Sequence, residues 1–113
     1  MEIHYSEQGS GLRIIKLSGR LDIIGTGEIE TKFAGYSAGD GVRLAVDLSG
    51  VDFLASIGIR LLMLTAKSIA SRGGKLVLFN PAPDVQSVLE ITGIPAIIPM
   101  VSSLEAAEVL LLA

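Results

Sequence analysis

Residues 47–59 read DLSGVDFLASIGI, and the spacing of the apolar residues changes across this stretch. Before it, residues 42–48 alternate between apolar and polar side chains, as a half-buried β-strand does. After it, from Ser56 to about Ser71, apolar side chains recur at the spacing of one helix face: Ile59, Leu62, Met63, Ala66, Ile69 and Ala70. The stretch therefore predicts a strand, a connection over residues 49–52, and a helix that Ser56 opens as a preferred capping residue.

The same two spacings alternate through the rest of the chain. Further strands are expected at 1–8, 12–18, 75–79 and 96–99, and further helices at about 24–36, 85–91 and 102–112. A glycine-containing turn at 9–11 joins the first two strands in a hairpin. Because helices and strands alternate after the hairpin, we expect a single α/β domain over residues 1–113. Its sheet should be mostly parallel, with an antiparallel strand near its start.

The composition narrows the classes of function. Half of the 113 residues are hydrophobic, the formal net charge is −3, and cysteine is absent. The lack of cysteine excludes disulfides, thiolate metal sites and cysteine catalysis. No cluster of lysine and arginine is present, which argues against nucleic-acid binding and against a polybasic membrane-binding segment. No apolar run reaches the roughly 20 residues of a membrane-spanning helix, and the first residues contain no apolar signal core. These features favour a cytoplasmic protein without membrane insertion.

The chain offers few residues for catalysis or metal binding. His4 is the only histidine, and a metal site needs several such ligands at workable spacing. The segment SRGGK at 71–75 resembles a phosphate loop only faintly, because its spacing is wrong and it leads into a strand. Asp47 and Asp52 are explained more simply by capping and turn hydrogen bonds than as paired catalytic carboxylates. We therefore expect neither an enzyme nor a bound cofactor or metal.

The stretch at 47–59 resembles the signature of the STAS domain, which is found in anti-sigma factor antagonists. In that family a strand ends in aspartate, a short loop with an aromatic residue follows, and a serine opens the next helix. Further segments resemble the family in the same order, namely 19–22 (GRLD), 74–78 (GKLVL) and 88–94 (VLEITGI). The resemblance implies a mixed, mostly parallel sheet of about five strands, an N-terminal hairpin and four helices. It also implies that Ser56 is phosphorylated by the partner anti-sigma factor, which is a serine kinase.

Three positions around Ser56 depart from the family pattern. Ala55 stands where the family usually has aspartate, Ile57 replaces a second hydroxyl residue, and Arg60 replaces a glycine. The phosphoacceptor is retained, but a kinase that expects the carboxylate would not find it at position 55. The residues expected to contact the partner are Asp22, Ala55, Ser56, Ile57, Gly58, Arg60 and Leu64.

Two functions are consistent with the resemblance. In the first, unmodified Ser56 permits docking to the anti-sigma factor serine kinase, which frees a sigma factor, and phosphorylation ends the docking. The protein would then be a monomer or a weak homodimer. In the alternative, the chain is a constitutive small subunit of an ABC-type membrane transport complex and stabilises its ATPase by contact alone. The protein that co-purifies with the chain distinguishes the two.

Overall fold

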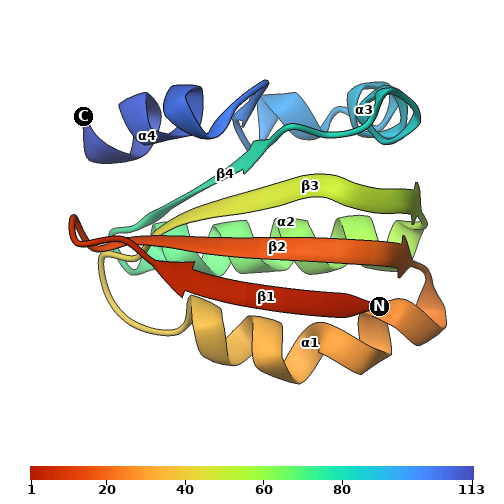
Figure 1. Cartoon of the computed structure of the whole chain (residues 1–113), viewed down its shortest axis with the longest axis horizontal. Coiled ribbons are helices and arrows are strands. Elements are labelled where there is room, and N and C mark those ends of the chain that lie inside the picture. The colour runs from red at the N-terminus through yellow and green to blue at the C-terminus, as the bar shows by residue number, and fades with distance from the viewer.

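The computed structural model describes residues 1–113 and contains one five-stranded sheet with strand order β1-β2-β3-β4-β5 (Figure 1). Its strands are β1 (Glu2–Glu7), β2 (Leu12–Leu21), β3 (Arg43–Leu54), β4 (Lys75–Phe79) and β5 (Met100–Val101). The first pair is antiparallel and the other pairs are parallel. The helices are α1 (Ile23–Ser37), α2 (Ser56–Ser71), α3 (Pro83–Ile91) and α4 (Leu104–Leu112), with a 3₁₀ turn, η1, at Ile94–Ala96. The predicted mixed α/β sheet with an N-terminal hairpin and four helices is confirmed.

Side chains alternate along the strands and give the sheet two apolar faces. On one face, Leu44 and Val46 of β3 join a cluster of 19 buried residues that includes side chains from α1, α2 and α3. On the other face, Ala45 of β3 joins a cluster of six with Leu111 of α4. Figure 1 shows α2 behind the sheet, α1 below β1, and α3 with α4 above β4. Both faces of the central strands are therefore covered, as the continuous apolar run of β4 requires. The prediction that residues 42–48 form a half-buried strand is wrong, because α4 covers the second face of β3 and Ala45 is fully buried there.

Strand β3 is longer than the sequence predicts. The expected connection at 49–52 is wrong, because these residues continue the strand as far as Leu54. They pair with the second half of β2 through two register shifts. The glycine at position 50 permits β3 to approach β2 closely, since a Cβ at Gly50 would lie 2.9 Å from the Leu17 carbonyl oxygen. The longer strand brings the start of α2 beside the end of β2.

The short strand predicted at 96–99 is also wrong. Gly93, with a φ of 77°, ends α3, and the next three residues form η1. The last strand begins only at Met100. Pro95 and Pro99 have no N–H to donate to a neighbouring strand, so pairing with β4 begins at the Pro99 carbonyl oxygen, which accepts from the Leu78 N–H at 2.9 Å.

Two residues expected in the core are exposed. Ile24 is 75% exposed, because α1 turns Ile29 and Phe33 towards the sheet instead. Ala70 is exposed near the end of α2. The other predicted apolar positions of α2 are buried or half-buried, as expected. None of the helices has the length and hydropathy that crossing a bilayer demands.

Candidate functional site

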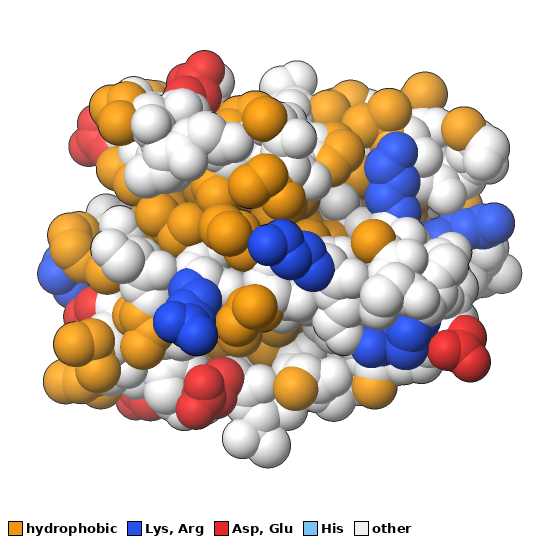
Figure 2. Space-filling view, turned by 180° about the vertical axis from the view of Figure 1, so that it is seen from behind, with side chains coloured by type: hydrophobic (Ala, Val, Ile, Leu, Met, Phe, Trp, Pro, Cys, Tyr) orange, Lys and Arg blue, Asp and Glu red, His pale blue; other side chains and the backbone are white.

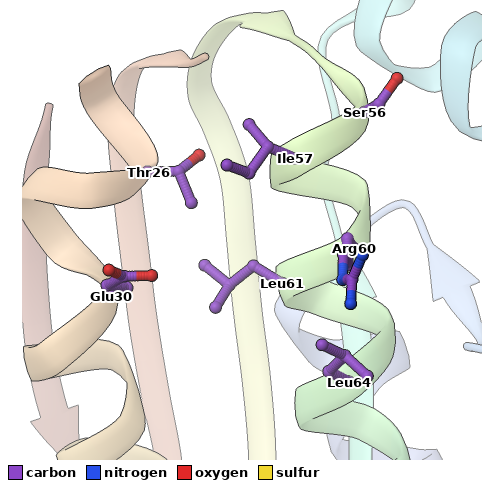
Figure 3. A pocket seen from close by; sticks show the side chains of 7 residues that line it. All are labelled: Thr26, Glu30, Ser56, Ile57, Arg60, Leu61 and Leu64. Carbon is purple, nitrogen blue, oxygen red and sulfur yellow. The ribbon is translucent and has the colours of Figure 1, made fainter. Parts of the chain in front are cut away.

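Ser56 is the first residue of α2, and its side chain is exposed. The capping position belongs to Ala55, which makes no side-chain hydrogen bond, so the prediction of Ser56 as the cap is wrong by one residue. Backbone hydrogen bonds of Ala55 determine where α2 begins. The Ala55 N–H donates to the Leu21 carbonyl oxygen at 3.0 Å, and the Ala55 carbonyl oxygen accepts from the Gly58 N–H at 3.0 Å. The Ser56 hydroxyl is left without a role in the helix, and it points away from α1 (Figure 3).

Gly58 is buried in the first turn of α2 and determines how closely the helix approaches β2. A Cβ at this position would lie 2.8 Å from the Leu21 Cβ and 3.1 Å from the Leu54 Cδ1. Such contacts are too short for normal packing, so a larger residue would push α2 away from the sheet. The sequence places Gly58 among the partner contacts, but in the structure it lies beneath the surface and positions Ser56.

Asp22 caps α1 at the same end of the sheet. Its Oδ1 accepts a hydrogen bond from the Gly25 N–H at 2.7 Å, and its Oδ2 lies 3.3 Å from the Arg20 Nε. The Gly25 bond is the largest cause of the lowered pKa of Asp22; burial opposes the shift and Arg20 adds to it. Arg20 also lies over the Phe53 ring, with the guanidinium carbon 4.1 Å from the ring centroid. These contacts join the end of β2 to α1 and to the end of β3.

Apolar side chains are exposed beside Ser56. Seen from the α2 side, hydrophobic side chains reach the surface in patches between Lys and Arg side chains (Figure 2). Ile57 is 39% exposed and Leu64 is 54% exposed, while Phe53 at the end of β3 is 40% exposed. Solvent-exposed aliphatic and aromatic groups next to a polar tip are typical of a protein contact surface.

The sequence misses two further exposed apolar residues, Ile23 and Ile24, in the first turn of α1. They directly follow the capping residue Asp22. The local sequence gives no signal for them, because an apolar helix face is wide enough to hold two adjacent residues, as Leu62 and Met63 of α2 show. They extend the apolar surface from α2 to the start of α1.

A groove of about 530 Å³ lies between α1 and α2 and begins at Ser56 (Figure 3). Ile57 and Leu61 point across it towards α1. The complete lining is Thr26 and Glu30 from α1, with Ser56, Ile57, Arg60, Leu61 and Leu64 from α2. The groove therefore contains four of the predicted partner contacts and two residues of α1 that the sequence does not indicate.

Four polar side chains line the groove, and none has a partner within the chain; one of them is the Ser56 hydroxyl described above. The Thr26 side chain is buried, at 2% exposure, and its hydroxyl makes no hydrogen bond. Glu30 and Arg60 lie on opposite walls and take part in no ion pair. Thr26 and Glu30 could not be found from the sequence, because the rotation of one helix against another is decided by tertiary packing.

The surroundings of Ser56 include no histidine. The single His4 lies on β1, where its Nε2 is 3.6 Å from a Glu2 carboxylate oxygen and both side chains are exposed. No group of three or more His, Cys, Asp or Glu side chains is close enough to hold a metal ion. What this end of the molecule presents is a free hydroxyl, an ionised carboxylate at Asp22 and an apolar surface.

Comparison with known proteins agrees with this architecture. Residues 6–107 match the STAS domain family. A Bordetella bronchiseptica protein named as an anti-sigma factor antagonist, BtrV, is 33% identical over 97 residues, which cover 86% of this chain and 84% of the relative. The crystal structure of an anti-sigma factor antagonist from Mycobacterium paratuberculosis has a TM-score of 0.88 at 22% identity, covering 99% of this chain and 94% of that one. The Bacillus cell fate determinant SpoIIAA in its phosphorylated form has a TM-score of 0.67 at 19% identity, covering 96% and 99%.

The two structural likenesses concern the fold. The family match covers almost all of the sheet and its helices, including both segments that meet at Ser56. Sequence identity to BtrV extends over most of both chains. The chain therefore belongs to the STAS domain family.

Proposed function

We propose that the chain is an anti-sigma factor antagonist that docks to an anti-sigma factor serine kinase through the surface around Ser56. Docking frees a sigma factor, and phosphorylation of Ser56 by the kinase ends the docking. The observation that carries the proposal is the exposed, unbonded Ser56 hydroxyl with exposed apolar side chains beside it. The name of the relative BtrV supports the same class of function. A partner of this kind places the protein in the cytoplasm.

A phosphate on Ser56 is compatible with the fold. It would carry about −1.5 to −2 charges and lie at the N-terminus of α2, where free N–H groups and the helix dipole favour an anion. The first turn of α2 contains no acidic residue and no side-chain cap. Arg60 is one turn further along and is in no ion pair. The i,i+4 spacing allows its guanidinium to pair with the phosphate.

A phosphate on Ser56 would weaken docking to the partner and would not unfold the domain. Ile57, Leu64 and Phe53 contribute to binding only if water is excluded from them. A doubly charged group in their midst would have to lose its hydration shell, at a cost on the order of several kcal/mol per ion. Docking would thus be lost while the domain stays folded.

Asp22 is the acidic residue that the kinase would meet near Ser56, because Ala55 provides no carboxylate. The hydrogen bond from the Ala55 N–H to the Leu21 carbonyl oxygen holds the two segments together. Asp22 carries its charge at neutral pH, and its lowered pKa keeps the carboxylate ionised further into acid than that of an ordinary aspartate. We infer that the partner reads this carboxylate together with the Ser56 hydroxyl.

Phosphate transfer from labelled ATP tests the proposal. The purified chain is incubated with the candidate kinase, and we expect label in the wild type and in Ser10→Ala, a control at another exposed serine. Ser56→Ala should remain unlabelled. Label of wild-type intensity in Ser56→Ala would overturn the assignment of the site.

The alanine at position 55 is also consistent with one alternative function. In this alternative the chain is a constitutive subunit of a membrane transport complex. Such a subunit needs no kinase, so the missing carboxylate would have no consequence. Co-purification decides between the two. A transporter ATPase that binds the wild type and Ser56→Asp equally supports the alternative, whereas a serine kinase that binds Ser56→Asp more weakly supports the main proposal.

A further inference from the structure

The groove between α1 and α2 continues beyond the part described above. A second hollow of about 330 Å³ follows it along the same pair of helices. Small side chains line this lower part, including Ala34 and Ala38 on the α1 side and Thr65 and Ser68 on α2. Leu64, which is 54% exposed, belongs to both parts. The two hollows adjoin at Leu64 and follow one another along the pair of helices, and together we call them the channel.

Opposite charges face each other across this channel without pairing. Glu30 stands on the α1 wall and Arg60 on the α2 wall, and Figure 3 shows them at a similar level along the groove. Neither takes part in an ion pair within the chain. The apolar side chain of Leu61 lies between them, and Leu64 follows Arg60 further along α2 (Figure 3).

This arrangement is complementary to itself. A two-fold axis that runs along the groove places α1 of one copy opposite α2 of the other, and every contact then occurs twice. Glu30 of each copy meets Arg60 of the other, because both lie at the same level on opposite walls. Residues near the axis, such as Leu61, meet their own counterparts.

We propose that the groove between α1 and α2 is the interface of a weak symmetric homodimer. Helices of 15 and 16 residues offer a face about 23 Å long, and a spacing of about 9 Å between them makes this face about 20 Å wide. That is under about 600 Å² per copy, the range of weak and transient contacts. The dimer therefore dissociates in the micromolar range or above, and monomer and dimer coexist.

The dimer has a consequence for Ser56, which lines the same groove. A second copy and any other protein would compete for this surface, so the dimer would cover Ile57 and Leu64 and block docking beside Ser56, whose hydroxyl points away from α1 (Figure 3). This inference goes beyond the proposed function and does not depend on it, because the interface is built from residues of this chain alone.

Sedimentation equilibrium tests the dimer on the purified chain, from about 1 μM to about 1 mM, a range that spans weak affinities. We expect a monomer–dimer equilibrium in the wild type. Arg60→Glu should weaken it at least about tenfold, because like charges then face each other. The double variant Glu30→Arg/Arg60→Glu restores opposite charges and should recover wild-type affinity to within about threefold. Lys32→Glu, an exposed charge reversal on α1 about 200° round the helix from Glu30, lines neither hollow; it is the matched control and should leave the equilibrium unchanged.

Each other result overturns the proposal. A chain that is monomeric over the whole range has no such interface. A dimer that Arg60→Glu leaves intact, or that the double variant fails to restore, uses another surface. All three positions are exposed in the monomer, and circular dichroism verifies that the variants are folded. Labelling of Ser56 by a kinase is measured separately, so failure of the dimer and failure of the proposed function are distinguishable.

Discussion

The hydroxyl of Thr26 is the one buried side-chain polar group that makes no hydrogen bond. A buried hydroxyl without a partner loses its bonds to water and gains none in return. It lies on the wall of the groove that also contains Ser56. Groups of this kind are expected where a binding surface has been kept at the expense of stability.

Replacing this hydroxyl by a methyl group should stabilise the domain. Thr26→Val preserves the shape of the side chain, and we expect the free energy of unfolding to rise by about 1 kcal/mol. Urea denaturation measures the change, with Thr31→Val at an exposed position of the same helix as a control near zero. A loss of stability in Thr26→Val would mean that the hydroxyl is bonded in solution.

The charge on Asp22 should make stability depend on pH. The folded-state pKa of Asp22 lies below its ordinary value of 3.8, first because of the Gly25 N–H. The stabilisation by the charged form is therefore complete above that ordinary value, and it is lost as the pH falls through the folded-state pKa. Asp22→Asn keeps a good helix cap but removes the charge.

Unfolding free energies measured between about pH 6 and about pH 2 test this linkage. The wild type should lose more stability over this interval than Asp22→Asn does. Asp40→Asn removes an exposed aspartate in the turn before β3 and should follow the wild type. Parallel curves for the wild type and Asp22→Asn would contradict the role assigned to the charge.

At the scale of elements, two arginines hold the end of α1 in place. The Arg13 Nη1 on β2 donates to the Tyr36 carbonyl oxygen at 3.0 Å and to the Ala38 carbonyl oxygen at 2.6 Å. From the end of α2, the Arg72 Nε donates to the Gly39 carbonyl oxygen at 2.8 Å. Positive charge is favourable at a helix C-terminus, where carbonyl groups lack partners.

Loss of the two Arg13 hydrogen bonds should destabilise the C-terminal end of α1. We expect Arg13→Met to lower the free energy of unfolding by about 1 kcal/mol, since two hydrogen bonds at a partly exposed site are lost. Arg43→Met, at an exposed position at the start of β3, is the control and should change stability little. Amide hydrogen exchange in the last turn of α1 should accelerate in Arg13→Met but not in Arg43→Met. Unchanged protection of this turn in Arg13→Met would contradict the role assigned to the Arg13 hydrogen bonds.

The uncapped start of α2 should accept negative charge. Ser56→Asp places a carboxylate at the first helical residue, beside free N–H groups and without a competing acid. We expect stability to rise by about 0.3–1 kcal/mol at low salt, and the gain should shrink as salt screens the interaction. Ser56→Asn matches the shape without the charge and should show no salt-dependent gain. Unfolding of Ser56→Asp would contradict a phosphate switch that leaves the fold intact.

At the scale of the whole molecule, the elements that can be predicted from the sequence are those encoded by the local spacing of apolar residues. The strand at 75–79 and the helix from Ser56 follow from the period of their apolar residues, and the structure confirms both. The continuation of β3 through residues 49–52 could not be predicted, because it depends on pairing with the distant second half of β2. Glu30 was missed at the site for the same reason, since its place opposite Arg60 follows from the packing of two helices.

The two faces of the sheet should unfold as one unit, although the hydrophobic clusters on them differ in size, with 19 and six buried residues. Leu111 of α4 belongs to the cluster of six, while the only two tyrosines, Tyr5 and Tyr36, stack at 4.5 Å on the side of the larger cluster. Both clusters draw side chains from β3, so loss of one face removes support from the other.

Leu111→Ala measures this coupling. Removal of a buried leucine side chain costs about 2–3 kcal/mol, and we expect tyrosine fluorescence and far-UV circular dichroism to report the same lowered urea midpoint. Leu112→Ala, whose side chain is 39% exposed, should move both midpoints much less. If the dichroism of Leu111→Ala fell before the tyrosine signal, α4 would detach from a sheet that remains folded, and the small cluster would be an independent unit. Coincident transitions would instead mean that the helix farthest in sequence from the tyrosines contributes to the stability of the surface on which Ser56 stands.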